Sequence, residues 1–168
     1  MEITLDELLA SREDRQRCQQ ELLRQHPGAT LVCLTVIMPG PVKRDMRSLV
    51  VAQAALDALV ARFGNDMAAM TTRDLRTGYE AFLLVPCPPE EAKRAVCEIE
   101  DTHPLGRLFD LDVLPDAEGA PLSRTDLGMA ERRCLLCGRE ARWCMRNHTH
   151  TRAELLAEID RMIGDYVR

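Results

Sequence analysis

The sequence predicts an α+β fold in which helices pack on a mixed or antiparallel sheet, as a single domain over residues 1–168. Three observations support this prediction. Segments with helical spacing alternate with short apolar runs of strand character. Hydrophobic residues make up 46% and charged residues 29% of the chain, which is typical of a globular protein with a core. A length of 168 residues also suits one domain.

The first part of the chain is expected to form two helices with a strand between them. Thr4 and Glu7 have the spacing of a capping box, and leucines recur behind them at helical intervals, in a helix that could break near Ser11. Residues 29–38 are β-branched and apolar and stop at a Pro-Gly-Pro turn, which indicates a buried strand. Residues 46–63 return to helical spacing and end at a glycine.

The second part is expected to supply two strands, a hairpin and two helices. Residues 77–85 and 105–114 have strand character, and the helix predicted over 88–99 opens with proline and acidic residues. A Pro-Asp-Ala-Glu-Gly turn indicates that residues 115–123 form a hairpin that returns along the preceding strand. A second capping box starts a helix over 151–163.

Composition and charge exclude several classes of protein. A net charge of −5 gives no general reason to expect nucleic-acid binding. The apolar run over 31–38 is too short to span a membrane, so no membrane partner is expected. The start of the chain does not resemble a secretory signal, and seven cysteines are an odd number. We therefore expect a cytoplasmic protein with reduced thiols.

Two acidic residues on one predicted strand form a candidate metal site. Asp110 and Asp112 are two positions apart, so their side chains point to the same face of the strand. Carboxylates held this close repel each other, and a cation such as Mg²⁺ removes that repulsion. The alternative interpretation is a solvated strand face, which is the commoner explanation for this pattern taken alone.

Basic residues near the carboxylates suit a ligand that carries several phosphates. Arg107 lies three positions before Asp110, and Gly106 allows the backbone to approach a ligand closely. Lys43 follows a rigid turn that could fix its ammonium group at the same site, although it could equally be a solvated loop lysine. Further positive charge, at the site or on the surface, comes from Arg124, Arg132 and Arg133.

Long segments of the chain resemble one family. The run over residues 100–113, with its His-Pro-Leu-Gly-Arg-Leu core, is followed by Leu-Ser-Arg at 122–124 and by Arg-Arg-Cys-Leu-Leu-Cys at 132–137. Residues 8–16 and 39–43 also fit. These segments resemble the citrate lyase holo-acyl-carrier-protein synthases, also called apo-citrate lyase phosphoribosyl-dephospho-CoA transferases. The resemblance covers nearly the whole chain.

The resemblance implies a nucleotidyltransferase-like domain and activity. Such an enzyme moves the phosphoribosyl-dephospho-CoA group from 2'-(5''-triphosphoribosyl)-3'-dephospho-CoA to a serine of the citrate lyase acyl carrier (gamma) subunit and releases diphosphate. In this chain, Asp110 and Asp112 would bind Mg²⁺, while Arg107, Lys43 and Arg124 would neutralise charge on the diphosphate.

The remaining candidate residues bind substrate or accept the serine proton. Gly106, Arg133 and His103 complete the set of expected substrate-binding residues. The base stays open between Glu100, His103 and the two aspartates, and His103 could instead shape the turn before Pro104.

Cysteines and histidines near the carboxyl end form a second candidate metal site. Cys134, Cys137 and Cys144 could supply three thiolates to a tetrahedral, structural Zn²⁺. His150 is the preferred fourth ligand because the family pattern resembles Cys-x5-His, and His148 is the alternative. Equally, the thiols could pack in reduced form as small hydrophobic groups.

Two other functions stay open. One is a non-catalytic, zinc-bearing adaptor of the citrate lyase complex, with the cysteine cluster as its functional centre. The other is the equivalent synthase for malonate decarboxylase, which uses the same precursor.

Overall fold

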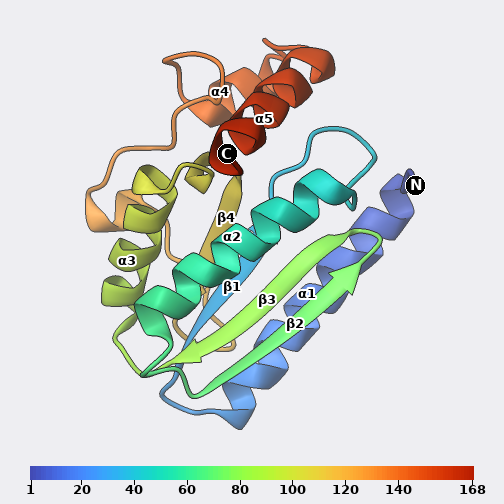
Figure 1. Ribbon diagram of the computed structural model, residues 1–168. Helices are drawn as coiled ribbons and strands as arrows, with labels where there is room; N and C mark the ends of the chain where they lie inside the picture. Colours follow the sequence, from blue (N-terminus) through green and yellow to red (C-terminus); the bar gives the residue numbers. More distant parts are fainter.

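The computed structural model describes residues 1–168, which form five helices, four strands and two short 3-10 turns (Figure 1). In chain order these are α1 (Leu5–Gln25), β1 (Thr30–Val36), α2 (Met46–Phe63), β2 (Ala69–Leu75), β3 (Gly78–Val85), α3 (Pro89–Thr102), η1 (Gly106–Leu108), β4 (Phe109–Leu114), η2 (Thr125–Leu127), α4 (Ala141–Arg146) and α5 (Arg152–Tyr166).

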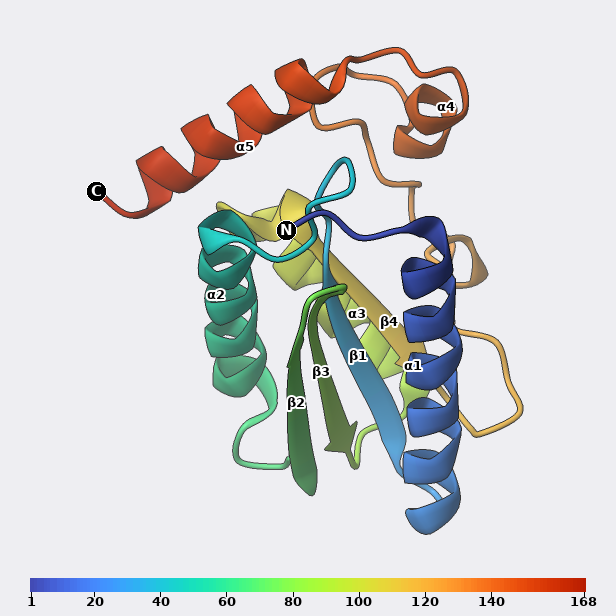
Figure 2. The ribbon, with the colours of Figure 1, turned by 90° about the vertical axis from the view of Figure 1, so that its right-hand side faces the viewer.

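The four strands form one sheet in the order β2-β3-β1-β4, and every neighbouring pair is antiparallel. The α+β prediction is therefore confirmed. Of the two predicted sheet types, mixed and antiparallel, the structure has the antiparallel one. Figure 2 shows α1 on one face of the sheet and α2 with α3 on the other, while α4 and α5 lie across one end. None of the helices is both long and apolar enough to cross a membrane.

Alternation along the strands divides the core between the two faces of the sheet. On one face, residues such as Val32, Leu34 and Leu111 pack against α2, α3 and α5. On the other face, Leu31 and its neighbours pack beneath α1. The register of β1 against β4 pairs Thr35 with Asp110 and Cys33 with Asp112, so both aspartates lie on the α1 side.

Capping residues place the helices as expected. Full capping boxes begin α1 at Thr4 and α5 at Thr151, and both were predicted. A third, at Asp45, begins α2. The first helix is continuous through Ser11, where a break had been considered.

Several predicted boundaries were wrong. β2 was not predicted, because its Ala-Met-Thr-Thr-Arg-Asp-Leu sequence is largely polar at the border of the sheet. Residues 106–108 form a 3-10 turn, so β4 begins only at Phe109. No hairpin strand forms over 115–123. The Leu122 N–H does donate to the Val113 carbonyl, but no strand pairing follows it.

The side of β4 that faces away from β1 is held by two side chains of α3. The Glu100 carboxylate accepts a hydrogen bond from the Leu111 N–H at 3.0 Å, and the Lys93 ammonium donates to the Leu111 carbonyl at 3.3 Å. Both side chains are buried, so each needs the partner that the strand provides. This pair fixes the strand that carries the aspartates.

Candidate functional site

A cavity of about 970 Å³ opens where β1 ends and β4 begins. Its walls come from α1, the loop after β1, β4 and the segment that contains α4. These segments are far apart in the sequence, and the sheet brings them together. The charged residues that line the cavity include Arg12, Arg15, Lys43, Arg107, Asp110, Asp112 and Arg132.

The two aspartates in this cavity have different surroundings. The Asp110 side chain is 50% exposed, accepts a hydrogen bond from the Thr35 hydroxyl at 3.1 Å and lies 3.9 Å from the Arg132 guanidinium. Asp112 is more buried and makes no side-chain hydrogen bond or ion pair. Burial, and then the charge of Asp110, raise the pKa of Asp112. A cation placed between them would offset this unfavourable arrangement.

Arg107 faces the cavity without an acidic partner. It lies in η1, is half-buried and also lines a smaller cavity of about 360 Å³ beside α5. Burial and the nearby Arg132 and Arg124 lower the pKa of this guanidinium. An anion that entered the cavity would relieve both effects.

Gly106 is required by its contact with the helix before it. A Cβ atom here would collide with the Glu100 carbonyl oxygen and lie 2.7 Å from that of Ile99. The glycine therefore lets the turn pack against the end of α3. The sequence had led us to expect that Gly106 lets a ligand approach the backbone closely. In the structure, it is the end of α3 that lies close to Gly106.

Lys43 and Arg12 form a second positive region of the cavity. The Lys43 ammonium donates to the Met38 carbonyl, and burial together with the charge of Arg12 lowers its pKa. Neither side chain has an acidic partner. Next to them, Arg15 is paired with the buried Glu80 at 3.3 Å. Two cations without counter-ions make this region suitable for phosphate oxygens.

Two predicted substrate-binding residues, Arg124 and Arg133, make contacts with other parts of the protein. Arg124 borders the cavity but is buried in ion pairs with Glu100, at 2.7 Å, and Asp101. Arg133 donates to the Gly138 carbonyl and lies outside the cavity lining.

His103 lies on the other side of the sheet from the aspartates. Its Nδ1 accepts a hydrogen bond from the Leu105 N–H at 3.0 Å. Its ring packs 4.9 Å from that of Phe109, whose side chain belongs to the opposite core. These contacts fit the alternative in which His103 shapes the turn.

Sequence reasoning did not select Arg12, Arg15 or Arg132 as site residues. The first two lie three positions apart on one helix, a spacing that puts both on one face, and they belong to a segment that carries the family resemblance. Arg132 had been noted only as added positive charge. Its guanidinium donates to the carbonyls of Gly106 and Arg107 and lies 3.6 Å from Glu100.

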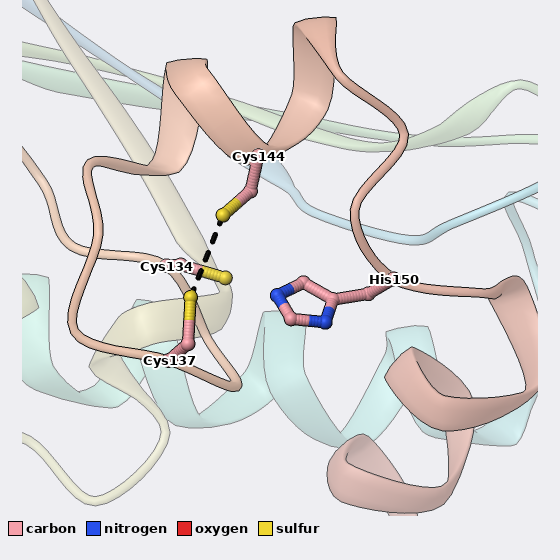
Figure 3. Close-up of side chains that lie close together, drawn as sticks. All are labelled: Cys134, Cys137, Cys144 and His150. Carbon is pink, nitrogen blue, oxygen red and sulfur yellow. Dashed lines mark hydrogen bonds between the residues drawn. The ribbon is translucent and has the colours of Figure 1, made fainter.

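The predicted Cys3His group converges in space. Figure 3 shows Cys134, Cys137 and Cys144 pointing toward His150. One ligand atom from each lies within 4.8 Å of all the others, so the group could bind a metal ion. The alternative ligand, His148, is exposed and outside the group.

The potential ligand atoms of this group have few hydrogen-bond partners. The sulfur atoms of Cys137 and Cys144 are 3.5 Å apart. The Nε2 atom of His150 is buried and has no hydrogen-bond partner. Burial opposes ionisation of Cys134, but the N–H groups of Leu136 and Cys137 and the thiols of Cys144 and Cys137 together lower the pKa of this thiol to about 7.

Comparisons with known proteins agree with the geometry. A family model described as apo-citrate lyase phosphoribosyl-dephospho-CoA transferase matches residues 3–166. Proteins of that name from Shigella boydii serotype 18 and Escherichia coli O157:H7 are each 39% identical over 166 residues, which is 97% of this chain and 90% of theirs. An Escherichia coli K12 protein described as a probable transferase of the same name is equally similar. The chain therefore belongs to the apo-citrate lyase phosphoribosyl-dephospho-CoA transferase family.

Proposed function

We propose that this protein transfers the phosphoribosyl-dephospho-CoA group from its triphosphate precursor to a serine of the citrate lyase acyl carrier subunit. The observation that carries the proposal is the shared cavity, in which two carboxylates face cations that lack acidic partners. A triphosphate carries the negative charge that both the cations and a metal held by the carboxylates would bind. The membership of a transferase family supports the same reaction.

The reaction breaks a phosphoanhydride bond of the precursor and forms a phosphate ester bond to the serine. The serine oxygen attacks the phosphorus next to the ribose, the bond from that phosphorus to the second phosphate breaks, and diphosphate leaves with the released electron pair. Arg107 and Lys43 are the cavity residues that would neutralise the diphosphate, and Arg12 extends the same positive region. The chain thus supplies mainly position and charge.

Asp110 and Asp112 are proposed to hold Mg²⁺. Their chemistry fits this ion, because both are oxygen donors on one strand face and the Asp112 carboxylate makes no side-chain hydrogen bond or ion pair. When bound, the ion would supply positive charge beside the phosphate oxygens. Thr35 orients Asp110, and Arg132 limits the room on the other side of that carboxylate.

The contacts of the candidate bases favour the aspartates as acceptors of the serine proton. Glu100 already accepts from the Leu111 N–H and pairs with Arg124. The Nδ1 atom of His103 also accepts a backbone hydrogen bond, on the far side of the sheet. Of these four candidates, only Asp110 and Asp112 line the cavity with a carboxylate oxygen that accepts no hydrogen bond.

The test is to incubate the protein with apo carrier subunit, the triphosphate precursor and Mg²⁺, and then to measure the intact mass of the carrier. We expect the carrier to gain one prosthetic group and one diphosphate to be released for each. An unchanged carrier mass with the wild-type protein would overturn the proposal. Offering the apo carrier of malonate decarboxylase in parallel distinguishes the related synthase.

We also propose that the Cys3His group binds a structural Zn²⁺. Three thiols and one imidazole suit tetrahedral zinc, and the unpartnered Nε2 of His150 points to a missing ligand contact. Elemental analysis should find one zinc per chain in the wild type and none in Cys137→Ser. The matched control is Cys97→Ser, a buried thiol on α3, which should keep the metal. A metal-free wild type would favour packed, reduced thiols.

The adaptor hypothesis gives a different result. An adaptor should lose binding to its partner when a chelator removes zinc, and Mg²⁺ should not matter. The transferase should lose turnover when Mg²⁺ is withheld, with zinc still bound.

A further inference from the structure

Positive charge is concentrated in one segment of this acidic protein. Between Arg132 and Arg152 lie six arginines and one glutamate, a net charge of +5. The whole chain carries −5, so all other residues together carry −10. An acidic partner would therefore be repelled by most of the surface and attracted by this segment.

The helix in this segment presents its arginines outward. Cys144 is buried in the Cys3His group, and successive residues of a helix are rotated by about 100°. Arg142 and Arg146, two positions to either side of Cys144, therefore lie on the opposite side of α4. The Arg142 side chain is 67% exposed and lies 3.9 Å from the Glu131 carboxylate, and Arg146 is exposed without an acidic partner.

Apolar side chains lie between these arginines. Trp143, the one tryptophan of the chain, is 44% exposed, and Met145 is 73% exposed. The Arg139 guanidinium lies 4.5 Å from the centre of the Trp143 ring, which keeps that ring in place. Aromatic, methionine and arginine side chains together are the groups enriched at protein interfaces. We call these five residues the α4 surface: Arg139, Arg142, Trp143, Met145 and Arg146.

The α4 surface is continuous with the cavity. Arg142 and Met145 belong to the cavity lining, as do Asp110 and Asp112, whereas Arg139, Trp143 and Arg146 lie beyond it. A protein bound to this surface would sit beside the cavity opening. It could then extend a serine toward the carboxylates while its own bulk stayed outside.

We propose that the α4 surface docks an acidic face of the acceptor protein that receives the prosthetic group. This inference rests on the proposed function, because it takes the acceptor to be a protein substrate. The phosphates of the nucleotide substrate have their own cations inside the cavity, at Lys43, Arg12 and Arg107. The outer arginines are therefore left for a macromolecular partner, and Trp143 with Met145 gives that contact an apolar centre.

The test is the double charge reversal Arg139→Glu/Arg146→Glu, at two positions outside the cavity lining. We expect the KM for the apo carrier subunit to rise at least tenfold while kcat stays within about twofold. Binding of inorganic tripolyphosphate with Mg²⁺ should not change. The matched control is Arg17→Glu/Arg94→Glu, which reverses two exposed arginines on α1 and α3. In the wild type, the KM for the carrier should also rise with salt.

Other results would contradict the docking proposal or the proposed function. An active wild type whose carrier KM is the same in both double variants would overturn the proposal. So would a reversal that changes only the sedimentation mass of the protein, since the surface would then join two copies of this chain. If the wild type shows no transfer, the proposed function fails, and calorimetric titration with apo carrier still tests docking: equal affinity for wild type and reversal contradicts it.

Discussion

The two candidate metal sites of this protein are built in opposite ways. Asp110 and Asp112 lie on a strand that is paired with β1 and bonded on its other side by α3. The Cys3His group lies on loops whose regular structure amounts to the six residues of α4 and one isolated bridge between Arg133 and Glu140. The first site is held by the core, and the second must be held by its own ligand contacts. Rigidity thus comes from packing in one region and from the proposed metal in the other.

Arg132 connects the two regions. Its backbone carbonyl accepts the Ala141 N–H within the cysteine segment, two residues before the first ligand. Its side chain reaches the carbonyls of Gly106 and Arg107 and lies near Asp110. The comparison between the regions can therefore be tested by changing one and measuring the other.

The largest expected effect is the loss of the metal from the cysteine segment. Cys144→Ser removes one of the four proposed ligands, and apparent binding free energies of structural zinc in small peptides are about 10–16 kcal/mol. We expect the zinc content to fall and the fluorescence of Trp143 to change, because Trp143 belongs to α4 and directly precedes Cys144. The far-ultraviolet circular dichroism of the sheet should persist. Loss of the whole fold would show that the two regions are not independent.

The next largest effect should be on the reaction rate and not on stability. Asp110→Asn is expected to lower kcat at least about a hundredfold, which corresponds to about 2.7 kcal/mol of transition-state stabilisation. The Tm should hardly move, because the side chain is half exposed. Asp57→Asn, on the exposed face of α2, is the control and should keep full turnover. Full activity of Asp110→Asn at limiting Mg²⁺ would exclude the metal role.

A pair of glycine variants compares the packing of the two regions. Gly106→Ala forces a Cβ against the end of α3, so we expect a loss of about 1–3 kcal/mol in the free energy of unfolding. Gly138 in the cysteine segment has open space around its Cβ position, so Gly138→Ala should change that free energy much less. Urea titration of both variants measures the difference. Equal losses would contradict the idea that the core, and not the loop, is close-packed.

The smallest effect concerns the acidity of Asp112. The pKa of this residue in the folded protein is raised above its usual value of 3.8, so the folded state binds the proton more tightly than the unfolded chain does. Stability should therefore fall as pH rises from 3.8 through the folded pKa, and the cost should persist at neutral pH.

Removing the charge of Asp112 tests whether its ionisation lowers stability. Asp112→Asn should raise the Tm at neutral pH by a few degrees and flatten its dependence on pH in the mildly acidic range. Turnover should fall at the same time, since the variant loses a proposed metal ligand. Asp6→Asn, on an exposed turn of α1, is the control for a general change in charge. A lower Tm for Asp112→Asn would mean that its carboxylate is stabilised in the fold.

Local signals predicted most of the fold. The capping boxes at Thr4 and Thr151 and the apolar run of β1 depend on neighbours in the sequence, and the structure confirms the elements that they predicted. β2 was missed because half of its side chains face solvent and it is held mainly by its pairing with β3. The expected hairpin after β4 failed for the opposite reason. Its turn residues are present, but side chains of α3 occupy the backbone groups of Leu111 on the outer edge of β4, where the hairpin would have paired.

The Cys3His group and the cavity also differ in how far local sequence signals could predict them. The spacing of the cysteines, together with the family pattern that favoured His150 over His148, selected the four side chains that converge within about 17 residues. The cavity could not be assembled from spacing, because Arg12 reaches it from α1 and Arg132 from the far end of the chain. Arg124 was selected for its charge, which the buried Glu100 already neutralises. Which charges are free is a property of the folded chain.

The hydrogen bonds from Glu100 and Lys93 to Leu111 also affect how the protein behaves in crowded solution. A strand at the border of a sheet normally exposes unpaired backbone groups that can recruit another chain and start aggregation. Here α3 occupies both backbone groups of Leu111 on β4, and the opposite border, β2, presents exposed polar side chains such as Thr72 and Asp74. Replacing Glu100 would leave the Leu111 N–H unpaired at this border, so we expect such a variant to aggregate more readily than the wild type.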